Sequence, residues 1–120
     1  PYLQYVYARI QSLIQKIGLP EYKASFDWSV LQKDQERNLM IQLGLFNSTV
    51  EMACQQYKTS ALCSYLYDLG KLYNSFYAEC SVAKAETESL KQARLFLSAS
   101  VAKVMERGLS LLGIPCPKRM

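Results

Sequence analysis

Apolar residues recur at intervals of three or four along most of this 120-residue chain, and this spacing constrains the fold more than any other feature. In residues 1–18, five aliphatic side chains fall on one helical face, and Gly18 with nearby Pro20 ends the pattern. Further helices are predicted over residues 30–44, 47–57, 60–80 and 88–112, whereas no Asn-Gly or Asp-Gly turn indicates a hairpin. We therefore predict an all-α fold: one domain, residues 1–120, forming a single bundle of about five helices.

The residue inventory argues against catalysis within this chain. There is no histidine, the commonest general base, and no glycine-rich nucleotide-binding motif. Glu86 and Glu88 are a carboxylate pair in a predicted connection over residues 81–88, where we expect them to be solvated. We expect no catalytic residue and no cofactor here. Because helical periodicity already begins at Pro1, we also expect a piece of a longer chain.

The four cysteines are widely spaced, and zinc sites usually pair their ligands closely. We therefore expect no metal site and four reduced thiols in a cytosol-like compartment. The sequence shows no signal peptide and no apolar run of about 18 residues, so we expect no membrane span.

Positive charge is concentrated at the two ends of the chain, which has a net charge of +4. Residues 1–20 contain Arg9 and Lys16 and no acidic residue, and residues 107–120 contain three basic residues and no acidic one. If the ends meet in the fold, they form one positive patch suited to phosphate. The alternative is a mildly basic domain whose ends never meet.

The first predicted helix carries a second stripe beside its apolar face. Tyr2, Tyr5, Arg9, Ser12 and Lys16 cluster about a quarter turn from the aliphatic residues, at 100° per residue. Tyrosine and arginine at the edge of a buried face suit stacking on nucleic acid bases. A seam between helices, with the cations reaching to solvent, explains the same pattern.

The predicted helix over residues 60–80 repeats this theme. Its apolar stripe is Leu62, Leu66, Leu69, Tyr73, Phe76 and Cys80. Tyr77 lies beside the stripe, on the flank of Gly70, which would leave the surface next to Tyr77 uncovered. Alternatively, Gly70 is a helix-packing contact and Tyr77 its neighbour in the core. Tyr65, Tyr67 and Tyr73 are interpreted as packing or surface residues.

Arg94 falls within the apolar stripe of the last predicted helix, so it needs an acidic partner or several carbonyls. We interpret Arg94 as structural rather than as an RNA contact, with Asp68 and Glu79 as candidate partners.

Four segments in order give a more specific indication: PYLQYVYARIQSL, ALCSYLYDLGKLYNSFY, KQARLFLSASVAKVMERGLSLLGI and a tail ending in KRM. Together they resemble the C-terminal, DALR-type anticodon-binding domain of arginyl-tRNA synthetases, over nearly the whole chain. The resemblance implies a parent enzyme, an arginine–tRNA ligase that joins arginine to its tRNA using ATP and Mg²⁺. The parent's catalytic motifs are missing here, so this chain alone should be inactive.

The resemblance also implies partners and a site. The expected partner is the anticodon stem-loop of arginine tRNA, bound by a cytoplasmic monomer beside the parent's catalytic domain; a mitochondrial parent is the alternative location. The family's anticodon-contacting aromatic, basic and methionine positions match Tyr2, Tyr5, Arg9, Tyr77 and Met120. With nearby cations expected to hold phosphates, the predicted tRNA-binding residues are Tyr2, Tyr5, Arg9, Lys16, Tyr77, Lys118, Arg119 and Met120. The tail and Tyr77 are expected to share one cleft with the first helix and to engage the central cytosine of the anticodon.

Three alternatives stay open at this point. They are a helical protein-interaction domain derived from a synthetase, the corresponding domain of another class I synthetase such as a cysteinyl one, and a stand-alone enzyme. Base-specific, salt-dependent RNA binding distinguishes the predicted function from the first.

Overall fold

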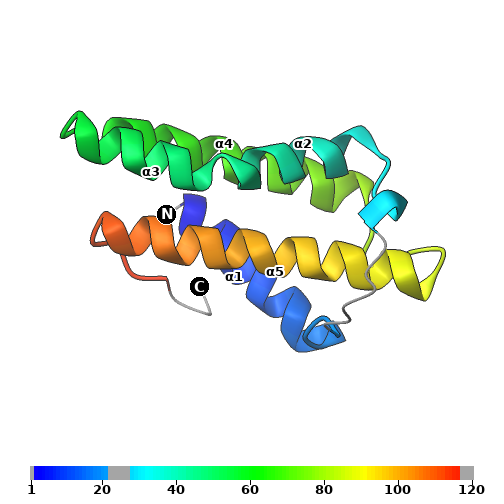
Figure 1. Ribbon diagram of the computed structural model, residues 1–120. Helices are drawn as coiled ribbons and strands as arrows, with labels where there is room; N and C mark the ends of the chain where they lie inside the picture. Colours follow the sequence, from blue (N-terminus) through cyan, green and yellow to red (C-terminus); the bar gives the residue numbers. More distant parts are fainter. Residues whose placement is uncertain (1, 22–27, 117–120) are drawn as a thin grey trace.

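A computed structural model describes residues 2–21 and 28–116 of the chain (Figure 1). Within those ranges it contains five α-helices, one short 3-10 helix and no strand, which confirms the predicted all-α class. The elements are α1 Tyr2–Ile17, η1 Trp28–Val30, α2 Asp34–Gly44, α3 Phe46–Gln55, α4 Ser60–Glu79 and α5 Glu88–Leu111. None of the helices in this described part is long and apolar enough to cross a membrane.

The helices form two layers around one core. Helices α2, α3 and α4 lie in one layer and α1 and α5 in the other, as Figure 1 shows. Helix α4 is central, because it packs against each of the other four α-helices. Its predicted apolar stripe is buried in full: Leu62, Leu66, Leu69, Tyr73, Phe76 and Cys80. Burial of these side chains, at about 25 cal/mol per Å² of apolar surface, is the main force holding the two layers together.

The junction between α2 and α3 differs from the prediction. Asn47, Ser48 and Thr49 are all within α3, and the residue preceding its first turn is Leu45, with helical backbone angles (φ −89°, ψ −3°). The hydroxyl groups of Ser48 and Thr49 donate to the carbonyl of Leu45 instead of capping backbone amides. The chain therefore continues from one helix into the next without the extended residue that a side-chain cap requires.

The start of α2 was also predicted too early. Residues 28–30 form η1, and α2 begins only at Asp34. The amide of Lys33 donates to Glu36 Oε1 (3.0 Å), which satisfies a backbone group that the first turn leaves unpaired. The side chain of Trp28 packs edge-on against Phe96, with ring centroids 5.1 Å apart, and so holds η1 against α5.

Gly70 is a helix-packing contact, as the alternative interpretation proposed, but Tyr77 is not its neighbour in the core, because Tyr77 is 42% exposed. It is buried, and a Cβ atom at this position would lie 3.1 Å from Leu3 Cδ2 and 3.2 Å from Tyr2 Cε2. A larger residue would push α1 away from α4 unless those side chains moved. The close approach at Gly70 therefore sets the position of the first tyrosine of α1 relative to α4.

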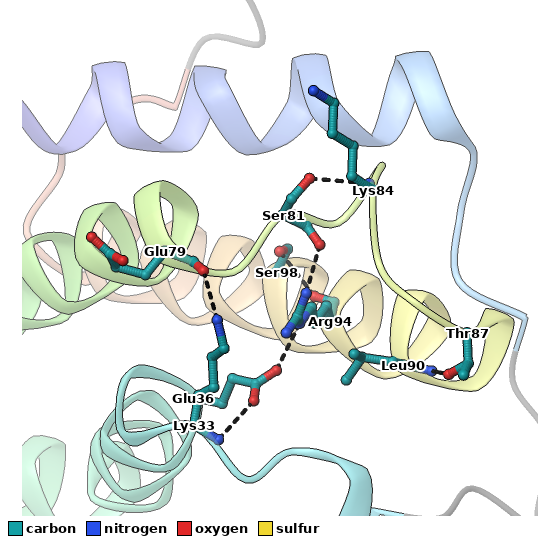
Figure 2. Close-up of polar contacts among 9 residues, drawn as sticks. All are labelled: Lys33, Glu36, Glu79, Ser81, Lys84, Thr87, Leu90, Arg94 and Ser98. Carbon is teal, nitrogen blue, oxygen red and sulfur yellow. Dashed lines mark hydrogen bonds and ion pairs between the residues drawn. The ribbon is translucent and has the colours of Figure 1, made fainter.

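The partner predicted for Arg94 was wrong, although its structural role holds. Its Nε atom pairs with Glu36 Oε2 of α2 at 2.8 Å, not with Asp68 or Glu79, and its Nη1 donates to the carbonyl of Ser81 at 2.7 Å (Figure 2). Both members of the ion pair are buried. Arg94 thereby links α2, α5 and the connection that follows α4.

A second buried contact continues this network into the core. The Tyr73 hydroxyl donates to Ser98 Oγ at 3.1 Å, and Ser98 Oγ donates to the carbonyl of Arg94 at 3.0 Å. Burial raises the pKa of Tyr73 to about 12, because the low-dielectric core disfavours the charged phenolate relative to the hydrogen-donating phenol.

Candidate nucleic-acid interface

The predicted stripe on α1 is exposed and lies on the flank that borders α4. Tyr2, Tyr5, Arg9, Ser12 and Lys16 are all accessible, and Tyr5 is the more open of the two tyrosines in this stripe, with 57% of its surface exposed. The apolar face of the same helix points into the core, where Val6 and Ile10 are buried. The helical period therefore separates a packing face from an accessible aromatic and basic flank.

Arg9 and Tyr77 meet on this flank. The guanidinium carbon of Arg9 lies 4.7 Å from the centroid of the Tyr77 ring, within the range of a cation–π contact. Tyr77 is 42% exposed, so it is neither a core residue nor fully solvated. Its ring is also 6.3 Å from that of Tyr73, which supports it from the core side. The contact leaves aromatic and guanidinium surface available to a further planar group.

Asn74 orients two residues of the α1 stripe, Tyr2 and Arg9, and sequence analysis missed it. Its Oδ1 accepts from Arg9 Nη1 at 3.1 Å, and its Nδ2 donates to the Tyr2 hydroxyl at 2.8 Å. The sequence did contain an indication that Asn74 belongs to the site, because residues 67, 70, 74 and 77 share one helical face. The amide fixes the direction of the guanidinium before any ligand arrives.

Tyr67 extends the same surface and was not included in the predicted site. Its ring lies 5.3 Å from that of Tyr2, and Lys71 Nζ lies 5.4 Å from its centroid. Tyr65 and Tyr73, by contrast, are buried. One exposed surface thus joins rings from α1 and α4 with cations placed over two of them.

Two hollows open on this surface, on either side of Arg9. The first, which we call the Lys16 hollow, has a volume of about 420 Å³ and is lined by Arg9, Ser12, Leu13, Lys16, Ile17, Tyr77 and residues 81–83. The second, the Tyr5 hollow, has a volume of about 340 Å³ and is lined by Tyr2, Tyr5, Val6, Ala8, Arg9, Ser12 and Asn74. The residues lining these two hollows include two cations and no carboxylate, so both favour an anionic ligand.

The segment after α5 lies on the opposite flank of α1. The Gln4 side chain donates to the carbonyl of Pro115 at 2.9 Å, and Cys116 lines a hollow with Tyr7 and Gln11. The two ends of the chain therefore approach each other, but the described tail does not border the Tyr5 or Lys16 hollow. The predicted site residues Lys118, Arg119 and Met120 lie outside the described residues.

The flank of α1 that faces the segment after α5 also differs in charge from the α1–α4 flank. The Tyr7 hydroxyl lies 3.3 Å from Glu106 Oε2, and burial, with the nearby Glu106 carboxylate as a further cause, raises the pKa of Tyr7. Burial, followed by Glu106, also raises the pKa of the Cys116 thiol. A carboxylate at this position disfavours phosphate, so the α1–α4 flank is the better candidate for nucleic acid.

Comparisons with known proteins give a consistent result. The sequence matches the DALR anticodon binding domain over residues 3–120. It is 44% identical to the arginine–tRNA ligase of Bdellovibrio bacteriovorus over 120 residues, which are 100% of this chain and 20% of that ligase. It is 42% identical over 119 residues to the Streptomyces coelicolor ligase, covering 99% of this chain and 20% of that one.

The fold is similar to solved structures as well. Superposition on the arginyl-tRNA synthetase of Thermus thermophilus gives a TM-score of 0.88 at 33% identity, covering 100% of this chain and 21% of that one. The chain spans about a fifth of the length of these relatives. These matches confirm the resemblance predicted from four sequence segments.

Proposed function

We propose that this chain, which belongs to the DALR anticodon binding domain family, binds the anticodon stem-loop of arginine tRNA as one domain of a longer arginine–tRNA ligase. That parent would join arginine to its tRNA in the cytoplasm, using ATP and Mg²⁺ bound by its catalytic domain, outside this chain. The alternative of a helical protein-interaction domain is not favoured, because the matching family and relatives are those of tRNA ligation.

The observation that carries this proposal is the contact between Arg9 and the half-exposed ring of Tyr77, set between two acid-free hollows. Proteins that recognise single-stranded RNA stack splayed bases on aromatic rings or guanidinium planes and contact base edges with polar groups. Tyr77, Arg9 and the exposed ring of Tyr5 provide such surfaces, and Lys16 provides a cation for an adjacent phosphate.

In the proposed mechanism, the anticodon loop is held open across the α1–α4 flank. A turned-out base, expected to be the central cytosine, stacks on Tyr77 while Asn74 keeps the Arg9 guanidinium in place. The family resemblance adds two further roles to this proposal. Lys118 and Arg119 would contact phosphates, and Met120 would contact the anticodon. We further propose that a monomer is sufficient, because Tyr2, Arg9 and Tyr77 all come from one chain.

Replacing Arg9 with lysine tests this proposal while preserving the charge. We expect the affinity for an arginine anticodon stem-loop to fall about five- to thirtyfold, because lysine keeps the cation but loses the planar, stacked and hydrogen-bonded group, at about 1–2 kcal/mol. Arg37→Lys is the matched control, since Arg37 is exposed on α2 and lines neither hollow. Equal loss in both variants, or no loss in either, would argue against this site.

A further inference from the structure

The connection between α4 and α5 forms one wall of the Lys16 hollow. Ser81, Val82 and Ala83 line that hollow together with Arg9 and Lys16 of α1. Sequence analysis interpreted this connection only as a linker, and neither the family match nor the predicted site assigns it a role. Its position next to Tyr77 raises the question of whether it also contacts a bound ligand.

The connection is held firmly at its start, which an ordinary surface loop need not be. Arg94 Nη1 donates to the Ser81 carbonyl at 2.7 Å, and its Nε atom pairs with Glu36 at 2.8 Å. Lys33 Nζ donates to the carbonyl of Glu79 at 3.2 Å, just before the connection. The side chain of Val82 is buried in the core. Residues 79–82 are therefore fixed to α2 and α5 before any ligand binds.

Lys84 projects from this fixed segment on the side of α1. Its backbone amide donates to Ser81 Oγ at 3.0 Å, which closes a tight turn over residues 81–84. Figure 2 shows the Lys84 side chain leaving the turn toward α1, on the opposite side from Arg94. Lys84 is exposed, and it directly follows Ser81, Val82 and Ala83, which line the hollow.

We propose that the turn over residues 81–84 is a further RNA-binding segment, with Lys84 contacting a backbone phosphate of the nucleotide held on Tyr77. The buried pair of Arg94 and Glu36 acts as the positioning pair for this turn. Arg9 and Lys16 line the hollow, and Lys84 directly follows the lining residues 81–83, so cations from two separate segments would neutralise the phosphates of a bound RNA backbone. This inference rests on the proposed function, because it names a further contact of the same RNA.

The test is the salt dependence of binding to the arginine anticodon stem-loop, measured with Lys84→Ala. The association constant falls as salt rises, and losing one phosphate contact should make the slope of its logarithm against log salt less negative by about 0.7–0.9. Binding should also weaken about fivefold at roughly 0.1 M salt. The loss should be the same for loops with different central bases, because a phosphate contact carries no sequence information. Lys84→Arg should keep the wild-type slope.

Lys103→Ala is the matched control, because Lys103 is also an exposed lysine but belongs to α5 rather than to the turn over residues 81–84, whose residues 81–83 line the Lys16 hollow. If Lys84→Ala keeps the slope and affinity of wild type while wild type distinguishes the loops, the inference is overturned and the proposed function stands. If wild type binds none of the loops, the proposed function fails and this inference fails with it.

Discussion

Replacing Glu36 with glutamine should lower the free energy of unfolding by about 3–5 kcal/mol, the largest effect we expect from a single polar substitution. The Glu36 side chain is 1% exposed and pairs at 2.8 Å with Arg94, whose side chain is 8% exposed. In the variant, the Arg94 guanidinium keeps its hydrogen bond to the Ser81 carbonyl but has no negative partner. The cost of removing the guanidinium charge from water is then no longer offset. Since domains are typically stable by only about 5–15 kcal/mol, this is a large share of the total.

Urea unfolding followed by circular dichroism at neutral pH measures the effect. Glu51→Gln is the control, because Glu51 is exposed on α3 and its replacement should change stability by less than about 0.5 kcal/mol. Replacing Glu36 and Arg94 together by methionine should recover much of the loss, since no unpaired buried charge remains. A loss below about 1 kcal/mol for Glu36→Gln would show that the ion pair does not hold α2 and α5 together.

Replacing Tyr77 with alanine should weaken binding of the arginine anticodon stem-loop by about 5- to 150-fold, which corresponds to about 1–3 kcal/mol of base stacking. Part of the effect is indirect, because Arg9 loses the ring that lies 4.7 Å beneath it. Tyr77 is 42% exposed, so we expect the helical content and the cooperativity of unfolding to be preserved.

Two further variants make this prediction specific. Tyr77→Phe should keep most of the affinity, because a phenyl ring still offers a stacking face. Tyr57→Ala should leave binding unchanged, since that tyrosine is 97% exposed and lines neither hollow. If Tyr77→Ala binds as tightly as Tyr57→Ala, then the aromatic ring at position 77 does not contact the RNA.

The sequence was sufficient to predict what depends on helical period alone. Residues of one helix keep fixed angular positions, so the flank carrying Tyr2, Tyr5 and Arg9 and the buried stripe of α4 both followed from spacing. The ends of α1 and α5 were also predictable. Gly18 adopts φ 110° and Gly113 φ 75°, conformations that suit glycine and stop a helix.

What required the three-dimensional structure was contact between segments. Glu36 and Arg94 are 58 residues apart, and the sequence does not state which helix faces α5 at that point, so α4 was an equally reasonable source of the partner. The contacts of Asn74 also required the structure, although its place on the same face as Tyr77 could be read from the spacing. Only the packing of α1 on α4 brings its amide between Arg9 and Tyr2.

The course of the tail could not be predicted for a related reason. Beyond Gly113 there is no helical period, and the direction of the chain depends on individual contacts such as that of Gln4 with Pro115. The described part follows the flank of α1 that carries Tyr7 and Gln11 rather than the stripe with Arg9. The idea of a single cleft shared by the tail and Tyr77 therefore remains a proposal from family resemblance.

The most direct test of the central claim is the affinity of this chain for two arginine anticodon stem-loops that differ only in the central base, measured across a salt series. We predict that the loop with central cytosine binds at least about fivefold more tightly at every salt concentration, the equivalent of one net hydrogen bond to a base edge at about 1 kcal/mol. Equal affinity for the two loops throughout the series would contradict anticodon reading by this surface.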